Sequence, residues 1–451
     1  MEINFLSKMF LPFILPFLVA GAQASLANPE QIHISWTENE HEMKITWSVF
    51  LETECKLWYR PTLCSDTSTD FAFKHIKSQH TKFDEGTWVN RFVFIHTAVL
   101  TNLRDDCFYE YYIENHISTS DTYIFSGQTP QSFDNYGNSN NPVKVIIFGD
   151  LGTGPHGNLT YQYLQADAVS RNFSAVFHMG DIAYNLESND GEVGDEFLNM
   201  IQSTAAIIPY MTLPGNHEND QNMLHYRMRF NMPKNNIDPD GLFYSLNIGP
   251  AHFVFLNTEI YFDYYNYPYD EEDYQRLWLI NDLTDANAHR NERPWIIVMT
   301  HHPLYCSYDF FRHSVERNIV CGADTWFFRD KFEDIFYEQG VDMFLAGHLH
   351  TYERMGPIYK NNTVKSERDD LNLHLNPQAT VYMIDGNGGS VIGHNAELST
   401  TPHLWNLYSS NDFGYGRMTV FNKTHLFFEQ FSAAQEKVTD TLWLIKTRNR
   451  F

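Results

Sequence analysis

Long hydrophobic segments are absent from the sequence after its first 24 residues, so no later part of the chain is able to cross a membrane as a helix. The closing stretch TLWLIKTRNRF is basic and unlike the apolar tail of a lipid-anchor signal, so we expect no membrane anchor. Positive charge is also scarce: 31 Lys and Arg residues face 56 Asp and Glu residues, which gives a net charge of −25. This imbalance argues against non-specific binding to nucleic acid or to anionic membranes.

Cysteine is rare as well, and the odd number of five excludes complete pairing within one chain. We expect a disulfide between Cys306 and Cys321. Cys55 and Cys64 are close enough in sequence to close a loop, which would leave Cys107 free or linked to a second chain. The sequence does not fix this connectivity, so a monomer and a homodimer both stay open.

The first 24 residues have the layout of a secretory signal peptide, with Lys8 before an apolar run over residues 9–20 and a small-residue exit at Ala24. A membrane anchor is the alternative, but Pro12, Pro16 and the short run argue against a spanning helix. We expect a secreted protein, either extracellular or lysosomal. Secretion agrees with four N-glycosylation sequons, at Asn158, Asn172, Asn361 and Asn422.

The chain of 451 residues is long enough for two ordinary domains. Short segments rich in aromatic and β-branched residues, separated by polar turns, fill residues 29–130 and predict a β-sandwich. The polar stretch SFDNYGNSNNP follows and predicts a linker over residues 131–142. A second domain is expected over residues 143–446.

In the second domain the pattern changes to continuous apolar runs, such as VKVIIFG, AVFHMG, WIIVMT and VDMFLAG. Such runs are typical of strands buried on both faces of a sheet, as in α/β folds. Helix-like stretches alternate with them, at residues 161–172, 273–288 and 323–340.

Polar clusters follow five of the predicted strands and include seven side chains able to bind a metal. Four clusters begin with a glycine, which permits the tight backbone exit that a crowded site needs. Each cluster alone is weak evidence, but their order along the chain favours one site. The seven candidate ligands are Asp150, Asp181, Tyr184, Asn216, His301, His348 and His350.

With these five clusters the sequence resembles the purple acid phosphatases, and more closely their long animal forms, within the calcineurin-like metallophosphoesterases. The resemblance covers most of the mature chain, including the closing segment from FGYGRMTVF to WLIK. It implies a fibronectin-type-III-like β-sandwich followed by a four-layer α/β/β/α metallophosphoesterase domain.

The resemblance also implies two metal ions. Asp150, Asp181, Tyr184 and His350 would surround Fe(III), while Asp181, Asn216, His301 and His348 would surround a divalent Zn, Fe or Mn ion. Asp181 would bridge the two. Packing beside the sheet is the alternative role for Tyr184.

Charge counting explains how so acidic a protein attracts phosphate. The two ions carry five positive charges against three negative charges from Asp150, Asp181 and Tyr184, which leaves two. A trivalent ion also acidifies water more strongly than a divalent one, so we expect hydroxide attack on phosphorus in acid.

Substrate contacts are expected beside the ligands. The family counterpart of His217 binds substrate and donates a proton, and we expect the same here. His302 is expected to point away from the metals. Plant members carry a substrate-binding histidine pair where this chain has Phe310 and Phe311, so His313 is the candidate replacement.

We therefore expect a secreted acid phosphatase that hydrolyses monoesters of phosphorylated small molecules or phosphoproteins. A phosphodiesterase or nucleotide pyrophosphatase on the same centre is one alternative. A non-catalytic extracellular binding protein is another, and the natural substrate is not revealed by the sequence.

Overall fold

The computed structural model describes residues 25–39, 41–65, 70–85, 91–133, 142–170, 173–262, 269–310, 323–398, 403–448 and 450. The predicted signal peptide, Asn172, Phe311, His313, Cys321 and most of the predicted linker lie outside these residues. Within the described ranges, no helix is both long and apolar enough to cross a membrane.

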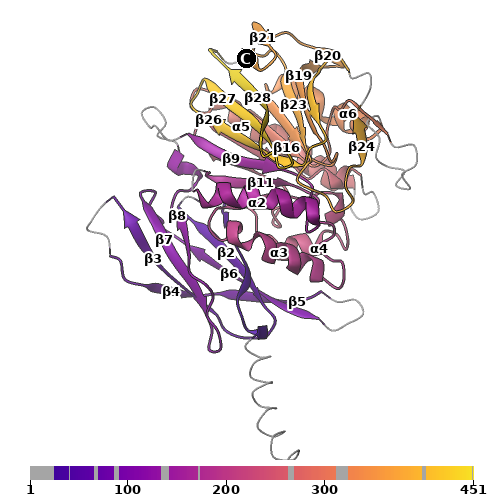
Figure 1. Ribbon diagram of the computed structural model, residues 1–451. Helices are drawn as coiled ribbons and strands as arrows, with labels where there is room; N and C mark the ends of the chain where they lie inside the picture. Colours follow the sequence, from indigo (N-terminus) through magenta and orange to yellow (C-terminus); the bar gives the residue numbers. More distant parts are fainter. Residues whose placement is uncertain are drawn as a thin grey trace, which may run out of the picture.

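The N-terminal domain is a β-sandwich, as the sequence predicted (Figure 1). Alternation along β7 (Cys107–Glu114) places every second side chain in the core, because successive residues of a strand face opposite sides. One sheet has the order β1 (Glu30–Trp36), β2 (Met43–Val49), β6 (Phe92–Leu100) and β5 (Gln79–Asp84). The other has the order β4 (Lys74–Lys77), β3 (Lys56–Cys64), β7 and β8 (Tyr123–Ser126).

The disulfide pairing differs from the loop closure considered above. Cys64 is bonded to Cys107, with their Cα atoms 4.1 Å apart, because β3 and β7 pair with these two residues directly opposite each other. Cys55 is buried and free. The predicted Cys55–Cys64 loop is wrong because the extended β3 separates its two ends by roughly 25–30 Å. Cys306 is disulfide-bonded, while its predicted partner Cys321 lies outside the described residues.

The second domain has two eight-stranded sheets packed face to face. The first sheet has the order β13 (Tyr210–Leu213), β11 (Ala175–Met179), β9 (Val143–Phe148), β26 (Gly414–Val420), β27 (His425–Ser432), β28 (Lys437–Ile445), β22 (Leu373–Leu375) and β21 (Arg368–Asp370). The second has the order β14 (Tyr244–Ile248), β15 (Ala251–Phe255), β16 (Trp295–Thr300), β18 (Met343–Ala346), β23 (Thr380–Asp385), β19 (Tyr352–Tyr359) and β20 (Asn362–Thr363), with β25 (Asn406–Ser410) on β19.

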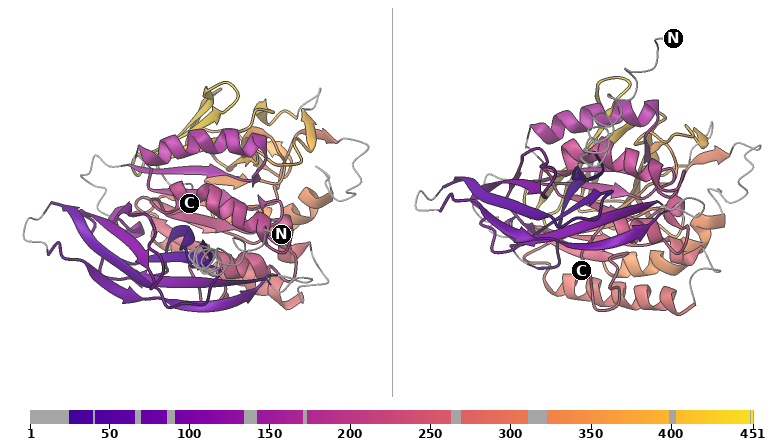
Figure 2. Two further views of the ribbon diagram at one scale, coloured as in Figure 1. Left: turned by 60° about the horizontal axis from the view of Figure 1, so that its bottom comes forward. Right: turned by 90° about the horizontal axis from the view of Figure 1, so that it is seen from below.

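Helices cover both outer faces, which completes four layers of the order α/β/β/α. Figure 2 shows the magenta helix α2 (Pro155–Val169) on one side of the domain and the salmon to orange helices α5 (Tyr269–Ala288) and α6 (Ala323–Glu338) on the other. The strands predicted as doubly buried are so, and every residue of β11, β15, β16 and β18 is buried. Two shorter helices, α3 (Glu192–Ala205) and α4 (Leu224–Arg229), were not predicted.

The sandwich docks on α3 and α4 through a buried cluster of charges. The guanidinium of Arg229, only 1% exposed, donates to Asp195 on the same domain at 2.9 Å and to Glu85 of the sandwich. Arg91 of the sandwich pairs with the same two carboxylates. Both acids therefore bridge the domains, and each charge in the cluster has an opposite partner.

Arg229→Met is expected to lower the free energy of unfolding by about 3–5 kcal/mol. The substitution leaves the buried carboxylates of Glu85 and Asp195 with only one of their two arginine partners. Chemical denaturation of the purified protein measures this. Arg227→Met is the matched control on the same helix, since Arg227 pairs with Asp240 near the surface and its loss should cost less than about 1 kcal/mol. Equal losses in the two variants would contradict the special role of the buried cluster.

Candidate metal centre

The seven predicted ligands follow strands of both sheets. Asp150 follows β9, Asp181 and Tyr184 follow β11, and Asn216 follows β13 of the first sheet. His301 follows β16, and His348 and His350 follow β18 of the second sheet. These strands run parallel within each sheet, so their carboxyl ends meet at one rim, where ligands of α/β folds usually bind.

Four side chains meet in a first group. Ligand atoms of Asp150, Asp181 and His350 all lie within 4.8 Å of one another. The Tyr184 hydroxyl is 3.1 Å from Oδ1 of Asp150 and 2.9 Å from Nε2 of His350. The four residues expected around Fe(III) are therefore brought together.

The second group contains the other predicted ligands. Ligand atoms of Asp181, His301 and His348 lie within 4.8 Å of one another. Oδ1 of Asn216 is 3.1 Å from Nε2 of His301 and 2.9 Å from Nδ1 of His348. Asp181 belongs to both groups, which is the arrangement that a bridging carboxylate requires.

The electrostatics of these groups favour cations. Asp150 and Asp181 are fully buried, and within the described ranges neither has a Lys or Arg within 4.0 Å. Burial raises the pKa of Asp150, while His301 and His217 overcome burial and hold the pKa of Asp181 well below its usual range. Burial and the two nearby carboxylates raise the pKa of Tyr184 well above 10, so its phenolate needs a strong cation. The oxygen and nitrogen donors fit a dinuclear metal cofactor.

Ring orientation adds to this fit. Nδ1 of His301 lies 2.9 Å from the carbonyl oxygen of Met179, and since a carbonyl only accepts, Nδ1 carries the proton. Nε2 is the ring nitrogen that faces Asn216 and Asp181, each 3.1 Å away, and it is the atom that would bind a metal. Metal-binding histidines generally have such a partner on their other nitrogen.

The ligand loops have strained backbones. Four ligands that are not glycine have a positive φ, an uncommon conformation that costs of order 1–3 kcal/mol each and is concentrated at functional sites. They are Asp150 (64°), Asp181 (54°), Tyr184 (61°) and His348 (69°).

Two of the glycines before the ligands have a role beyond the tight backbone exit that was predicted. Gly180 does adopt a left-handed conformation, with φ +77°. At Gly215, however, an added Cβ would lie 2.4 Å from Oδ1 of Asp181, and at Gly347 it would lie 2.6 Å from Oδ2 of Asp150. These two glycines therefore leave room for a ligand of a neighbouring loop.

Comparison with known proteins agrees with this geometry. Residues 29–126 match the purple acid phosphatase N-terminal domain, residues 143–352 the calcineurin-like phosphoesterases, and residues 379–441 the iron/zinc purple acid phosphatase-like protein C-terminal model. Acid phosphatase type 7 of the zebrafish Danio rerio is 36% identical over 93% of this chain and 92% of its own length. The chain belongs to the purple acid phosphatase family.

Other members of the purple acid phosphatase family are similar along most of the chain. Human acid phosphatase type 7 is 33% identical, over 94% of this chain and 94% of its own. The solved structure of a purple acid phosphatase from yellow lupin seeds shares the fold, with a TM-score of 0.75 and 22% identity over 93% of this chain and 75% of that one.

Glu218 is a residue of the site that sequence reasoning did not assign. Its buried carboxylate accepts hydrogen bonds from the backbone nitrogens of Asp181 (2.9 Å), Ile182 (2.8 Å) and Gly215 (2.8 Å). It therefore joins the loop that carries Asp181 to the loop that carries Asn216. Its place two residues after the candidate ligand Asn216, in the run Gly-Asn-His-Glu at residues 215–218, was the available signal. A carboxylate that binds only backbone, however, cannot be recognised from composition.

His217 lies at the rim of the centre with its side chain 20% exposed. Its backbone nitrogen donates to Oδ1 of Asp181 at 3.0 Å, and its ring lies beside the ring of Tyr184 with centroids 4.6 Å apart. Nδ1 contacts Oδ1 of Asn185. Because an amide oxygen only accepts, Nδ1 carries a proton and Nε2 is the atom left for other partners.

His302 is in neither ligand group. Its ring lies against the ring of His348, with centroids 4.0 Å apart, and its Nε2 is 3.2 Å from Oε1 of Glu259. The side chain of Phe310, with Phe311 and His313, lies outside the described residues, so the expected substrate role of His313 stays a prediction.

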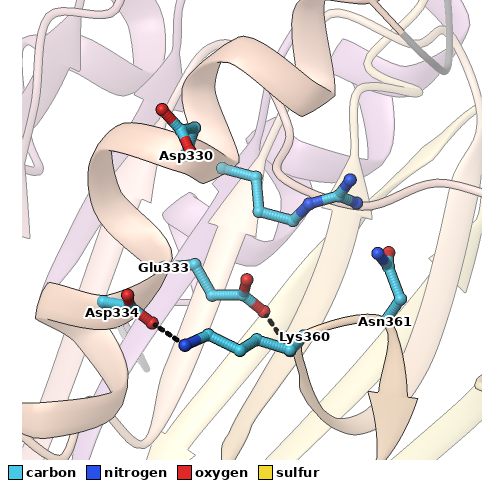
Figure 3. A pocket seen from close by; sticks show the side chains of 6 residues that line it. Asp330, Glu333, Asp334, Lys360 and Asn361 are labelled. Atoms are coloured by element: carbon cyan, nitrogen blue, oxygen red, sulfur yellow. Dashed lines mark hydrogen bonds and ion pairs between the residues drawn. The ribbon is translucent and has the colours of Figure 1, made fainter.

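A separate pocket of about 220 Å³ lies between α6 and the hairpin of β19 and β20 (Figure 3). None of the seven candidate ligands lines it. Lys360 Nζ pairs with Asp334 at 3.2 Å, and the Lys360 backbone nitrogen donates to Glu333 at 2.7 Å. These charged groups are thus already engaged with one another. The lining residues are Arg329, Asp330, Glu333, Asp334, Lys360 and Asn361.

Proposed function

We propose that this member of the purple acid phosphatase family hydrolyses phosphate monoesters at acidic pH. The observation that carries the proposal is the pair of buried ligand groups that share Asp181, with the hydroxyl of Tyr184 between Asp150 and His350. A phenol in this position distinguishes the site from other metallophosphoesterase centres, as the sequence resemblance implies.

Asp150, Asp181, Tyr184 and His350 would hold Fe(III), and Asp181, Asn216, His301 and His348 would hold a divalent Zn, Fe or Mn ion. When bound, these ions would supply positive charge for the phosphate and lower the pKa of water, so that a hydroxide nucleophile is available in acid. The carboxylates and the phenol of the chain offset part of that charge and leave an excess for the anionic substrate.

His217 would bind the ester and donate a proton to the departing alcohol. Its exposure at the rim supports this role, as does Asn185, whose Oδ1 accepts from Nδ1 and leaves Nε2, which lies 3.8 Å from Oδ2 of Asp181, to contact the ester. Glu218 would keep the two loops on either side of His217 in register through its three backbone hydrogen bonds.

The substrates would be phosphorylated small molecules or phosphoproteins met outside the cell or in the lysosome. The predicted signal peptide supports secretion, and the sequon residues Asn158, Asn361 and Asn422 are exposed and open to glycosylation. Both proposals concern where the enzyme works and are independent of the chemistry at its centre.

The first experiment combines the metal content, visible spectrum and pH–activity profile of the purified protein with those of Tyr184→Phe. We expect iron, a visible absorption band and an acidic optimum in the wild type, and loss of the band in the variant, because only a phenolate bound to Fe(III) gives that transition. A colourless, iron-free protein after expression with ample iron would contradict the proposal.

Substrate choice is measured on the same preparation. We expect faster turnover of a phosphate monoester than of a diester or a dinucleotide pyrophosphate. The reverse order would favour a phosphodiesterase, and phosphate binding without turnover would favour a non-catalytic binding protein.

A further inference from the structure

We propose that Asn395 is a positioning residue that holds the ligands His348 and His350 in their metal-binding arrangement. Its side-chain Oδ1 accepts a hydrogen bond from the backbone nitrogen of His350 at 2.9 Å, and its Nδ2 donates to the backbone carbonyl of His348 at 2.8 Å. One amide thus fixes both ends of the ligand segment. The inference rests on the proposed dinuclear metal centre.

The ligand segment needs such a partner because its own backbone is irregular. His348 has a φ of +69°, and Leu349 and Thr351 donate to the carbonyls two residues before them, those of Gly347 (2.8 Å) and Leu349 (2.6 Å). These tight turns leave the carbonyl of His348 and the nitrogen of His350 without a partner in a helix or a strand. An amide side chain offers one donor and one acceptor, which is what this pair of groups requires.

The two residues before Asn395 hold the same segment. The carbonyl of Gly393 lies 2.5 Å from Nδ1 of His350, so this nitrogen carries the proton and Nε2 faces the Tyr184 hydroxyl at 2.9 Å. Nδ1 of His394 donates to the carbonyl of His350 at 2.8 Å. Residues 393–395, in the loop after β23, therefore fix the backbone of residues 348–350 as well as the ring orientation of His350.

The expected effect of losing Asn395 is on metal affinity. Outer partners of metal ligands typically contribute 10–100-fold to affinity, and Asn395 contacts the segment of one ligand from each group. We expect Asn395→Leu, which removes both hydrogen bonds, to weaken binding of both ions by about 10–100-fold. Asn395→Asp keeps the acceptor for His350 but loses the donor for His348, so it should weaken the divalent ion more than iron.

The experiment measures metal per chain and release to a competing chelator for the wild type, both Asn395 variants and Asn376→Leu, together with the unfolding midpoints of the metal-free proteins. Asn376 is the matched control, because its buried amide also joins two segments, through Glu367 and Thr447, away from the ligands. Asn376→Leu should lower the unfolding midpoint and leave metal affinity unchanged. Both Asn395 variants should lower metal affinity and leave the unfolding midpoint of the metal-free protein unchanged.

Three outcomes would overturn the inference, and they are distinguishable. Wild-type metal affinity in folded Asn395→Leu would overturn the positioning role alone, with the proposed function intact. A wild-type protein that binds no iron and no divalent ion would overturn the proposed function and the positioning role together. Equal losses of metal affinity in Asn395→Leu and Asn376→Leu would overturn the positioning role of Asn395, because they would reflect general destabilisation.

Discussion

Asp181→Asn should lower kcat/KM by on the order of 10³ or more, because a metal centre supplies several kcal/mol of transition-state stabilisation and each 1.4 kcal/mol is tenfold in rate. Asp181 is the one residue shared by both ligand groups. An amide has no negative charge and offers only one oxygen, so it cannot bridge two cations as a carboxylate does. Asp181→Asn should therefore bind both metal ions more weakly than the wild type.

Metal analysis of Asp181→Asn, beside steady-state kinetics, tests this explanation. Asp167→Asn is the control, because Asp167 accepts hydrogen bonds from Tyr415 and Arg417 outside the centre. It should keep the metal content and activity of the wild type. An Asp181→Asn protein with two ions per chain and near-normal activity would rule out a bridging role.

His217→Asn should keep both ions and lower kcat by roughly 10²–10⁴, the usual contribution of a general acid. The loss should be much larger for an alkyl phosphate than for a nitrophenyl phosphate. An alkoxide is a poor leaving group that needs a proton, whereas a nitrophenolate departs without one. Steady-state kinetics on the two substrates, with metal content measured on the same sample, gives both quantities.

His289→Asn is the control for this prediction, since His289 lies on the surface near Asp285, away from the centre. It should leave both rates unchanged. An equal loss on the two substrates in His217→Asn would argue against proton donation and would leave substrate binding as the role of His217.

The clustering of the seven candidate ligands was predictable because each lies within five residues after the end of an apolar strand. Runs such as those before Asp150 and His301 identify buried strands, and parallel strands end at a common rim. The disulfide was not predictable, because proximity in sequence suggested Cys55 and Cys64 while pairing of β3 with β7 placed Cys64 opposite Cys107. Helix α3 was missed although it is nearly as long as α2; it begins directly after the Asn-Asp-Gly turn at residues 189–191, which is typical of a loop.

The supporting residues around the ligands were hidden for a related reason. Glu218 and Asn395 act through backbone groups, and any residue offers the same backbone groups, so no side-chain pattern identifies the pairing. Asn395 lies 45 residues after the segment that it holds. The same applies to Gly215 and Gly347, whose missing side chains make room for ligands from other loops.

The sequence by itself determined the two-domain organisation, the strands buried on both faces and the chemical identity of the seven candidate ligands, because these depend on local periodicity and side-chain type. The family resemblance implied the bridging position of Asp181. Only the tertiary structure decided which ring nitrogen of each histidine faces the centre and which distant residues hold the loops. Those features depend on distances between atoms of different strands, and such distances are set by the packing of the two sheets rather than by any local pattern.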